Sequence, residues 1–403
     1  MKEIKVVIGK NFGDEGKGAA VDRFCKGKRS LVVRHNGGAQ AGHTVEEGKF
    51  RFVFHQLGSG SFRGAFTYWS YTFLPDLLKL SEEIEGFEVA AEKCLPAKIY
   101  AHPDCACTTV YDVLLNSLTE QLRGNEKHGS CGMGIYEAVC RTKDKQYALY
   151  LKDFVDAEIE EIVRKLQKIR DEYTAIRLKQ LCALFKERWK QPDVQNWLEL
   201  IADDNILWNA AQRMCDNFKK YVVFSEWGAL AKQFDVIVFE NAQGLMLDMD
   251  NREYYPHLTP SHTGLTNVVD LLKEIDYSGS IEIAYITRTY ITRHGAGRLD
   301  HECAKDDINS KMQDYTNVPN PWQDTLRYAR HPWGEEFFRY MKKDLENLRF
   351  LQQKNGDKIQ IRITLWLTHM DETDGKIIFA DKIRTEEEVI QECKKQGIDV
   401  YSK

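Results

Sequence analysis

Short runs of apolar, mostly β-branched residues recur along the chain, and glycines or polar residues follow each of them. Such runs lack the alternation of a half-exposed strand, so they are typical of strands buried on both faces, as in a parallel sheet. The runs lie at residues 4–8, 31–33, 234–239, 281–286 and 359–367. Amphipathic stretches such as residues 75–92 predict helices between them. The pattern predicts an α/β fold with a large, mostly parallel central sheet flanked by helices.

A long charged stretch interrupts this alternation. From Asp156 to about Lys190, apolar residues recur at helical spacing, as in Ile159, Ile162 and Leu166, and charged residues occupy the other positions. No candidate catalytic group stands out there. We therefore expect one domain over residues 1–403, with a helical insertion or cap over residues 152–220.

Composition narrows the class of protein. The formal net charge is −5, and 43% of residues are hydrophobic and 29% charged, which argues against a general nucleic-acid binder. No apolar run is long enough to span a bilayer, and the first residues predict a strand, so we expect a cytoplasmic location and no membrane. Ten cysteines are too few for a disulfide scaffold. Cys105 and Cys107 are expected to be reduced thiols.

The first glycine loop is a candidate phosphate site. Residues 9–18 follow the first buried run and precede a predicted helix, and glycines there let an anion approach backbone N–H groups at the helix N-terminus. Lys17 adds a positive charge. The loop differs from a Walker A motif because Asn11 and Gly18 replace the expected glycine and hydroxyl residue. Tight turns also use such glycines, so this loop alone leaves both interpretations open.

Two acids give the first loop a further property. Asp14 and Glu15 would repel a phosphate unless one of them binds a cation or exchanges a proton. A second glycine loop, residues 34–44, follows the next buried run and ends in His43 and Thr44. Together, the sequences GDEGKG at residues 13–18 and GGAQAGHT at residues 37–44 resemble the paired signature of the adenylosuccinate synthetase family. Gln40 stands where that family usually has Asn.

The resemblance implies a P-loop-like ligase of purine biosynthesis that joins L-aspartate to a 6-oxopurine monophosphate through a 6-phosphoryl intermediate. Asp14 would take the purine N1 proton and, with Gly42, hold Mg²⁺. His43 would act on the transferring phosphoryl group, Lys17 would balance charge on the phosphates, and Gln243 would contact the purine O6 region. The residues implied to bind nucleotide are Gly13, Glu15, Gly16, Gly18, Asn36, Ser130, Cys131, Arg141, Thr263, Arg293 and Asp371. In the family the counterpart of Arg141 reaches across a dimer interface, which implies a homodimer.

Departures from the family pattern leave the substrates open. The loop that usually binds the carboxylates of aspartate is altered at residues 316–329, where Arg327, with Arg293, is the candidate replacement. That change resembles phage-type relatives that act on a guanine nucleotide, but those often lack the acid that Asp14 provides. His369 stands where lysine is usual in the element that recognises guanine, so the phosphate donor is GTP or ATP.

Three functions follow. The favoured one is ligation of aspartate to IMP, giving adenylosuccinate at the expense of a nucleoside triphosphate. The second is the same reaction on GMP or dGMP. The third is a purine-nucleotide sensor that has lost ligation, which the altered loop permits and which Asp14, Lys17, His43 and Gln243 argue against.

Overall fold

A nine-stranded sheet forms the centre of the molecule. A computed structural model describes residues 3–124, 132–312, 326–349, 351 and 359–402 of the chain. The strand order is β16-β13-β9-β1-β8-β2-β5-β6-β7, and all neighbouring strands are parallel. The predicted α/β fold with a large parallel sheet is therefore confirmed.

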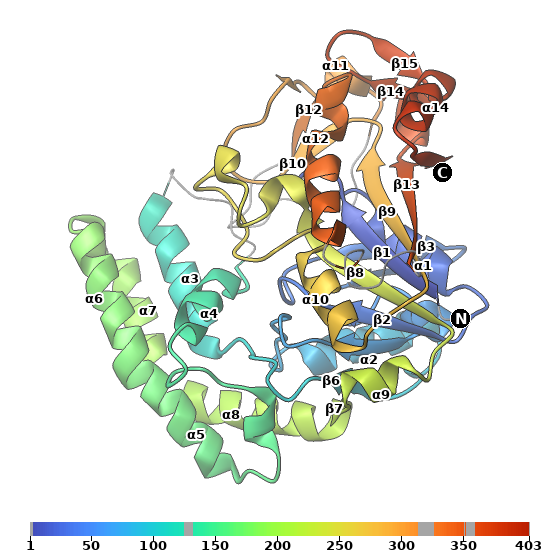
Figure 1. The fold of residues 1–403 in the computed structure, drawn as a ribbon. Coiled ribbons are helices and arrows are strands. Elements are labelled where there is room, and N and C mark those ends of the chain that lie inside the picture. Colours follow the sequence, from blue (N-terminus) through green and yellow to red (C-terminus); the bar gives the residue numbers. More distant parts are fainter. Residues whose placement is uncertain (1–2, 125–131, 313–325, 350, 352–358, 403) are drawn as a thin grey trace.

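The strands of this sheet include every apolar run noted in the sequence. Their bounds are β1 (Glu3–Gly9), β2 (Ser30–Arg34), β5 (Phe66–Trp69), β6 (Ile99–Ala101), β7 (Val222–Phe224), β8 (Val236–Gly244), β9 (Ser280–Arg288), β13 (Gln360–Thr368) and β16 (Asp399–Ser402). β1 lies between β8 and β9 (Figure 1). Because every strand runs the same way, the loops after β1, β2, β8, β9 and β13 leave the sheet at one edge.

Helices cover the sheet and extend beyond it. The α-helices are α1 (Lys17–Cys25), α2 (Leu80–Ala91), α3 (Val110–Arg123), α4 (Ile135–Thr142), α5 (Ile159–Lys168), α6 (Ala175–Leu184), α7 (Pro192–Ala202), α8 (Asp204–Tyr221), α9 (Trp227–Ala231), α10 (Thr266–Glu274), α11 (Asp306–Asn309), α12 (Glu335–Leu345) and α14 (Glu386–Lys395). Helices α5 to α8 gather at the end of the sheet formed by β6 and β7 (Figure 1). No described helix is both long and apolar enough to cross a membrane.

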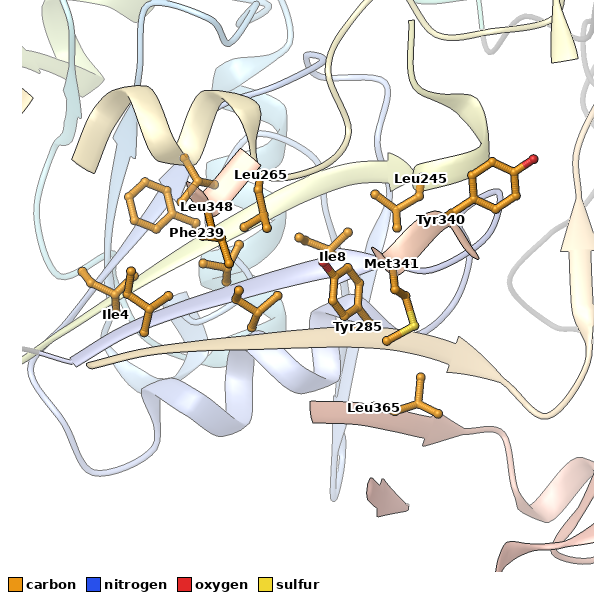
Figure 2. Packing of buried hydrophobic residues seen from close by; sticks show 14 of the residues in the cluster. Ile4, Ile8, Phe239, Leu245, Leu265, Tyr285, Tyr340, Met341, Leu348 and Leu365 are labelled. Carbon is orange, nitrogen blue, oxygen red and sulfur yellow. The ribbon is translucent and has the colours of Figure 1, made fainter. Parts of the chain in front are cut away.

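The main hydrophobic core lies between the sheet and helices α10 and α12. Figure 2 shows Ile4 and Ile8 of β1, Phe239 of β8 and Tyr285 of β9 gathered with Met341 of α12. All of these side chains are buried. Burying a side chain of this size contributes about 1.5–3 kcal/mol, so this face fixes β1 and its loop firmly.

Small antiparallel sheets supplement the central one. β3 (His43–Glu47) pairs with β4 (Phe50–Phe54), and β14 (Lys376–Ile378) pairs with β15 (Ile383–Thr385). A third sheet has the order β10-β12-β11. Its strands are β10 (Ile291–Arg293), β11 (Glu302–Cys303) and β12 (Arg327–Ala329).

Asp344 of α12 is a buried acid that anchors this helix to the sheet. Its carboxylate accepts a hydrogen bond from the backbone N–H of Leu265 at 2.8 Å and another from the hydroxyl of Tyr285 at 2.9 Å. Burial nevertheless raises the pKa of Asp344 to about 6. The unfolded chain, with a pKa of about 3.9 at this residue, releases the proton first, so this residue lowers stability as pH rises from about 4 through 6.

Replacing Asp344 with asparagine should remove this part of the pH dependence. Relative to the wild type, the free energy of unfolding of Asp344→Asn should rise by about 3 kcal/mol between about pH 4 and pH 7. Urea unfolding across this range measures the difference. Parallel pH profiles for the two proteins would contradict the assignment.

Candidate active site

Loops from β1, β8, β9 and β13 contact one another at the carboxyl edge of the sheet. The hydroxyl of Thr368, at the end of β13, donates to the carbonyl of Glu15 at 2.9 Å. Arg288, at the end of β9, donates through Nε to the carbonyl of Asp14 at 2.5 Å. Parallel sheets bind ligands in the crevice at this edge, so the first glycine loop lies where a ligand site is expected.

The first loop turns sharply before α1. Asp14 has a φ of 55° and Gly16, the N-cap of α1, a φ of 83°, both in the left-handed region. Glycine is the residue that adopts this region most readily, and no side chain caps the helix. The N-terminal N–H groups of α1 therefore remain directed toward the loop, as in an anion site.

Glu15 and Lys17 are buried groups of opposite charge beside this turn. A Cβ atom on Gly9 would lie 2.5 Å from Oε2 of Glu15 and 3.0 Å from Nζ of Lys17, so only glycine leaves room for both. The other oxygen of Glu15 accepts from the backbone and side-chain N–H groups of Asn11 at 2.8 and 2.7 Å. Burial raises the pKa of Glu15 to about 7 and lowers the pKa of Lys17, and each charge partly offsets the shift of the other.

His43 is held by a buried carboxylate on β8. Its Nδ1 donates to Glu240 at 2.5 Å, and Arg34 lies 3.5 Å from the same oxygen. The hydroxyl and backbone N–H of Ser59 also donate to Glu240. Burial alone would raise the pKa of Glu240, but Arg34 and His43 lower it to about 2.

The environment of His43 favours the neutral ring in the absence of ligand. Burial lowers the pKa of His43 to about 4, against the opposing effect of Glu240. A phosphoryl group beside the ring would add a second negative charge next to it and raise its proton affinity. The arrangement resembles an oriented histidine that can exchange a proton when an anion is bound.

Gln243 lies at the end of β8, against the first loop. Its φ is 65°, and a Cβ atom on Gly13 would lie 3.4 Å from its Oε1. The neighbouring Ala242 forms two hydrogen bonds with the Asn36 amide, at 2.8 and 3.0 Å. The hydroxyl of Thr263 donates to the carbonyl of Gly244 at 3.0 Å. Asn36 and Thr263 are both buried, and through these hydrogen bonds they stabilise the turn that carries Gln243.

Arg293 and Arg327 face each other across the pair of strands β10 and β12. Arg327 donates to both carboxylate oxygens of Glu302, at 2.8 and 2.6 Å. Arg293 is buried, lies over the ring of Phe12 at 4.6 Å, and its Nε has no hydrogen-bond partner among the described residues. Burial, together with Arg327, lowers the pKa of Arg293 to about 10. Like charges directly opposite on paired strands are unfavourable, so this pair is suited to an anion.

Other predicted residues lie apart from this cluster. Arg141 is buried and donates to Asp112 at 2.8 and 2.9 Å and to the backbone carbonyls of Tyr147 and Cys107. These contacts place the Arg141 guanidinium inside its own chain, and its expected reach across a dimer interface stays a prediction. Asp371 lies on the exposed surface. Ser130 and Cys131, with most of the altered loop at residues 316–329, lie outside the described residues.

Several residues near the site escaped sequence reasoning. Glu240 of β8 contacts His43, and Ser59, from the segment after β4, donates to Glu240; both lie far from His43 or from each other in the chain. His294 lies 3.3 Å from the Asp14 carboxylate. Ser59 and His294 lie beside glycines and Glu240 directly follows an apolar run, and the sequence offered no other signal for these three residues.

One further group of possible metal ligands lies behind the turn that carries Gln243. Ligand atoms of Asp248, Asp250 and His262 lie within 4.8 Å of one another. Asp248 already accepts from the backbone N–H groups of Thr263 and Asp250, at 2.7 and 2.9 Å. These internal bonds account for the geometry of the group.

Known proteins share these motifs and this fold. The family model for adenylosuccinate synthetase matches residues 6–322. The adenylosuccinate synthetase of Picrophilus torridus is 30% identical over 336 residues, which cover 81% of this chain and 74% of that protein.

Solved structures with the same fold include two enzymes. A fully ligated adenylosuccinate synthetase from Plasmodium falciparum matches with a TM-score of 0.61 and 18% identity, over 93% of this chain and 78% of that one. The cyanophage S-2L succinoaminodeoxyadenylate synthetase, bound to dGMP and to dATP as an energy donor, matches with a TM-score of 0.56 and 14% identity, over 100% of this chain and 92% of that one. At these identities the two structures show the fold alone. The family model and the Picrophilus relative establish more: the chain belongs to the adenylosuccinate synthetase family of purine-nucleotide ligases.

Proposed function

We propose that this protein condenses L-aspartate with IMP to give adenylosuccinate, driven by hydrolysis of GTP or ATP. One observation carries the proposal. The first loop, which contains Asp14 and Lys17, lies against Gln243 at one edge of the sheet, where Gln243 contacts Gly13. His43, oriented by Glu240, follows the second loop and shares this buried charged environment, since its pKa is affected by Lys17. A non-ligating sensor would need the nucleotide-binding groups but no buried, oriented histidine.

The chemistry divides one difficult displacement into two easier ones. The terminal phosphoryl group of the triphosphate is transferred to O6 of the purine while Asp14 accepts the N1 proton. His43 and Lys17 stabilise the negative charge on the transferring group, as do the N–H groups of α1. The amine of aspartate then attacks C6, a C–N bond forms, the C6–O bond breaks, and O6 leaves with the phosphate.

Asp14 of the first loop and Gly42 of the second are the proposed ligands of magnesium. The side chain of Asp14 keeps 34% of its surface exposed, and Gly42 is exposed as well. A carboxylate and a backbone carbonyl are oxygen ligands of the kind that Mg²⁺ prefers. Bound there, Mg²⁺ would neutralise charge on the phosphates and favour their transfer.

Arg293 and Arg327 are the proposed binding groups for the carboxylates of aspartate. The unpartnered Nε of Arg293 and the repulsion between the two guanidinium groups both favour a bound anion. Glu302 and the carbonyls of Gly295 and Gly297 already accept from Arg327, so Arg293 would make the larger contribution.

A second candidate acceptor is GMP or dGMP. The cyanophage enzyme was solved with dGMP, and its match covers the whole of this chain and 92% of the cyanophage chain. The intact Asp14 favours IMP as the acceptor. A homodimer remains a prediction.

The most direct test is phosphate release with magnesium and L-aspartate, comparing IMP, dIMP, GMP and dGMP against GTP and ATP. We expect aspartate-dependent release with IMP and a product with the mass of adenylosuccinate. Release only with GMP or dGMP would replace the proposed acceptor, and no release with any combination would leave the sensor as the explanation.

Replacement of Asp14 with asparagine should abolish turnover and preserve nucleotide binding. Asparagine has nearly the same size but cannot take up the N1 proton, so kcat should fall by a factor of about 100 or more. Binding of IMP measured by calorimetry should change little. Normal turnover in this variant would contradict the role of Asp14.

Replacement of Glu240 with glutamine tests the support of His43. The variant leaves Arg34 without its buried counter-charge and removes the charge that favours a protonated His43, so kcat should fall by roughly 100-fold with little change in KM. Ser59→Ala is the matched control, because it removes a hydrogen bond to the same carboxylate but keeps the charge. Equal effects of the two variants would contradict an electrostatic role for Glu240.

A further inference from the structure

His294 contacts the acid of the first loop from a different part of the chain. It directly follows β10, and its Nε2 lies 3.3 Å from Oδ2 of Asp14. The side chains are 18% and 34% exposed, so the contact is partly shielded from water. Nothing in the sequence pattern pointed to this pair, because the two residues are far apart in the chain, one after β1 and the other directly after β10.

Two arginines fix the segment that carries His294. Arg327 donates to the carbonyls of Gly295 and Gly297 at 3.1 and 2.8 Å, and Arg293 donates to the carbonyl of Arg298 at 2.6 Å. Glu302 in turn orients Arg327. His294 therefore lies at the start of a turn held by hydrogen bonds from two arginines, which limits the positions that its ring can reach.

The backbone of Asp14 is fixed independently. Its carbonyl accepts from Arg288, and its φ of 55° is an uncommon value for a residue other than glycine. The backbone contacts leave rotation of the carboxylate unrestrained. A donor on one carboxylate oxygen restrains that rotation and leaves the other oxygen available.

We propose that His294 is a positioning residue that donates from Nε2 to Oδ2 of Asp14 and thereby directs the other oxygen of Asp14 toward the purine. This inference rests on the proposed function, in which Asp14 accepts the N1 proton. Lys17 and Arg288 also act on Asp14 through their charges. Arg288, however, donates to the backbone carbonyl of Asp14. Among the described ion pairs, His294 is the side chain that lies within 4 Å of the Asp14 carboxylate. Catalysis depends strongly on such orientation, since small errors in position reduce rates greatly.

Two substitutions separate donation from packing. In His294→Gln, the amide nitrogen can take the place of Nε2, whereas His294→Leu keeps the bulk and has no donor. We expect His294→Leu to lower kcat by about 10-fold or more with an unchanged KM for the purine nucleotide, and His294→Gln to restore most of the rate. Equal loss in both variants, or none in His294→Leu, would overturn the proposal.

A double-mutant cycle with Asp14→Asn tests the contact without relying on turnover. In the absence of ligands, the change in Tm caused by His294→Leu should differ between the wild-type background and the Asp14→Asn background, because the carboxylate that accepts from His294 exists in only one of them. Additive changes in Tm would overturn the contact. If the wild type is inactive and the cycle is non-additive, the proposed function is wrong but the contact between His294 and Asp14 is real. If the wild type is active and His294→Leu does not affect its activity, only the positioning role of His294 is wrong.

Discussion

The parallel pairing of β1 with both β8 and β9 is the constraint on which the site depends. Parallel strands leave the sheet at the same edge, so the loop after β1 must meet the ends of its two neighbours there. β8 brings Gln243 to this edge and β9 brings Arg288. The core beneath, shown in Figure 2, buries the strands on this face and keeps their ends in register.

Burial of charge at this edge is the second feature that shapes the site. Glu240 is stable as a carboxylate inside the protein because Arg34, His43 and Ser59 surround it. Glu15 and Lys17 offset each other only in part beneath the first loop, because burial still raises the pKa of Glu15 to about 7. Such groups cost desolvation free energy, and a phosphate bound beside Lys17 and His43 would gain from a site already oriented before it arrives.

Local patterns in the sequence were sufficient for the fold and for the residues of the first loop. Buried strands have a continuous apolar signature, and glycine loops after them are visible residue by residue, so β1, its loop and Lys17 could be predicted. The family signature then singled out His43 and Gln243, and the family model confirmed the membership.

Contacts between distant segments could not be predicted in this way. Whether Arg141 pairs with Asp112 or reaches a partner depends on how α4 packs against α3, which no local pattern encodes. The pairing of Arg293 with Arg327 depends on the register of two short strands. His294 looks like an ordinary loop residue until the ends of β1 and β10 are placed side by side.

The central claim is that this edge phosphorylates O6 of a purine before aspartate displaces it. The most direct measurement uses IMP labelled with ¹⁸O at position 6, with L-aspartate, magnesium and a triphosphate, and follows the label by mass spectrometry. The account predicts that the label appears in inorganic phosphate in proportion to the adenylosuccinate formed. Adenylosuccinate formation with the label released into water would contradict it.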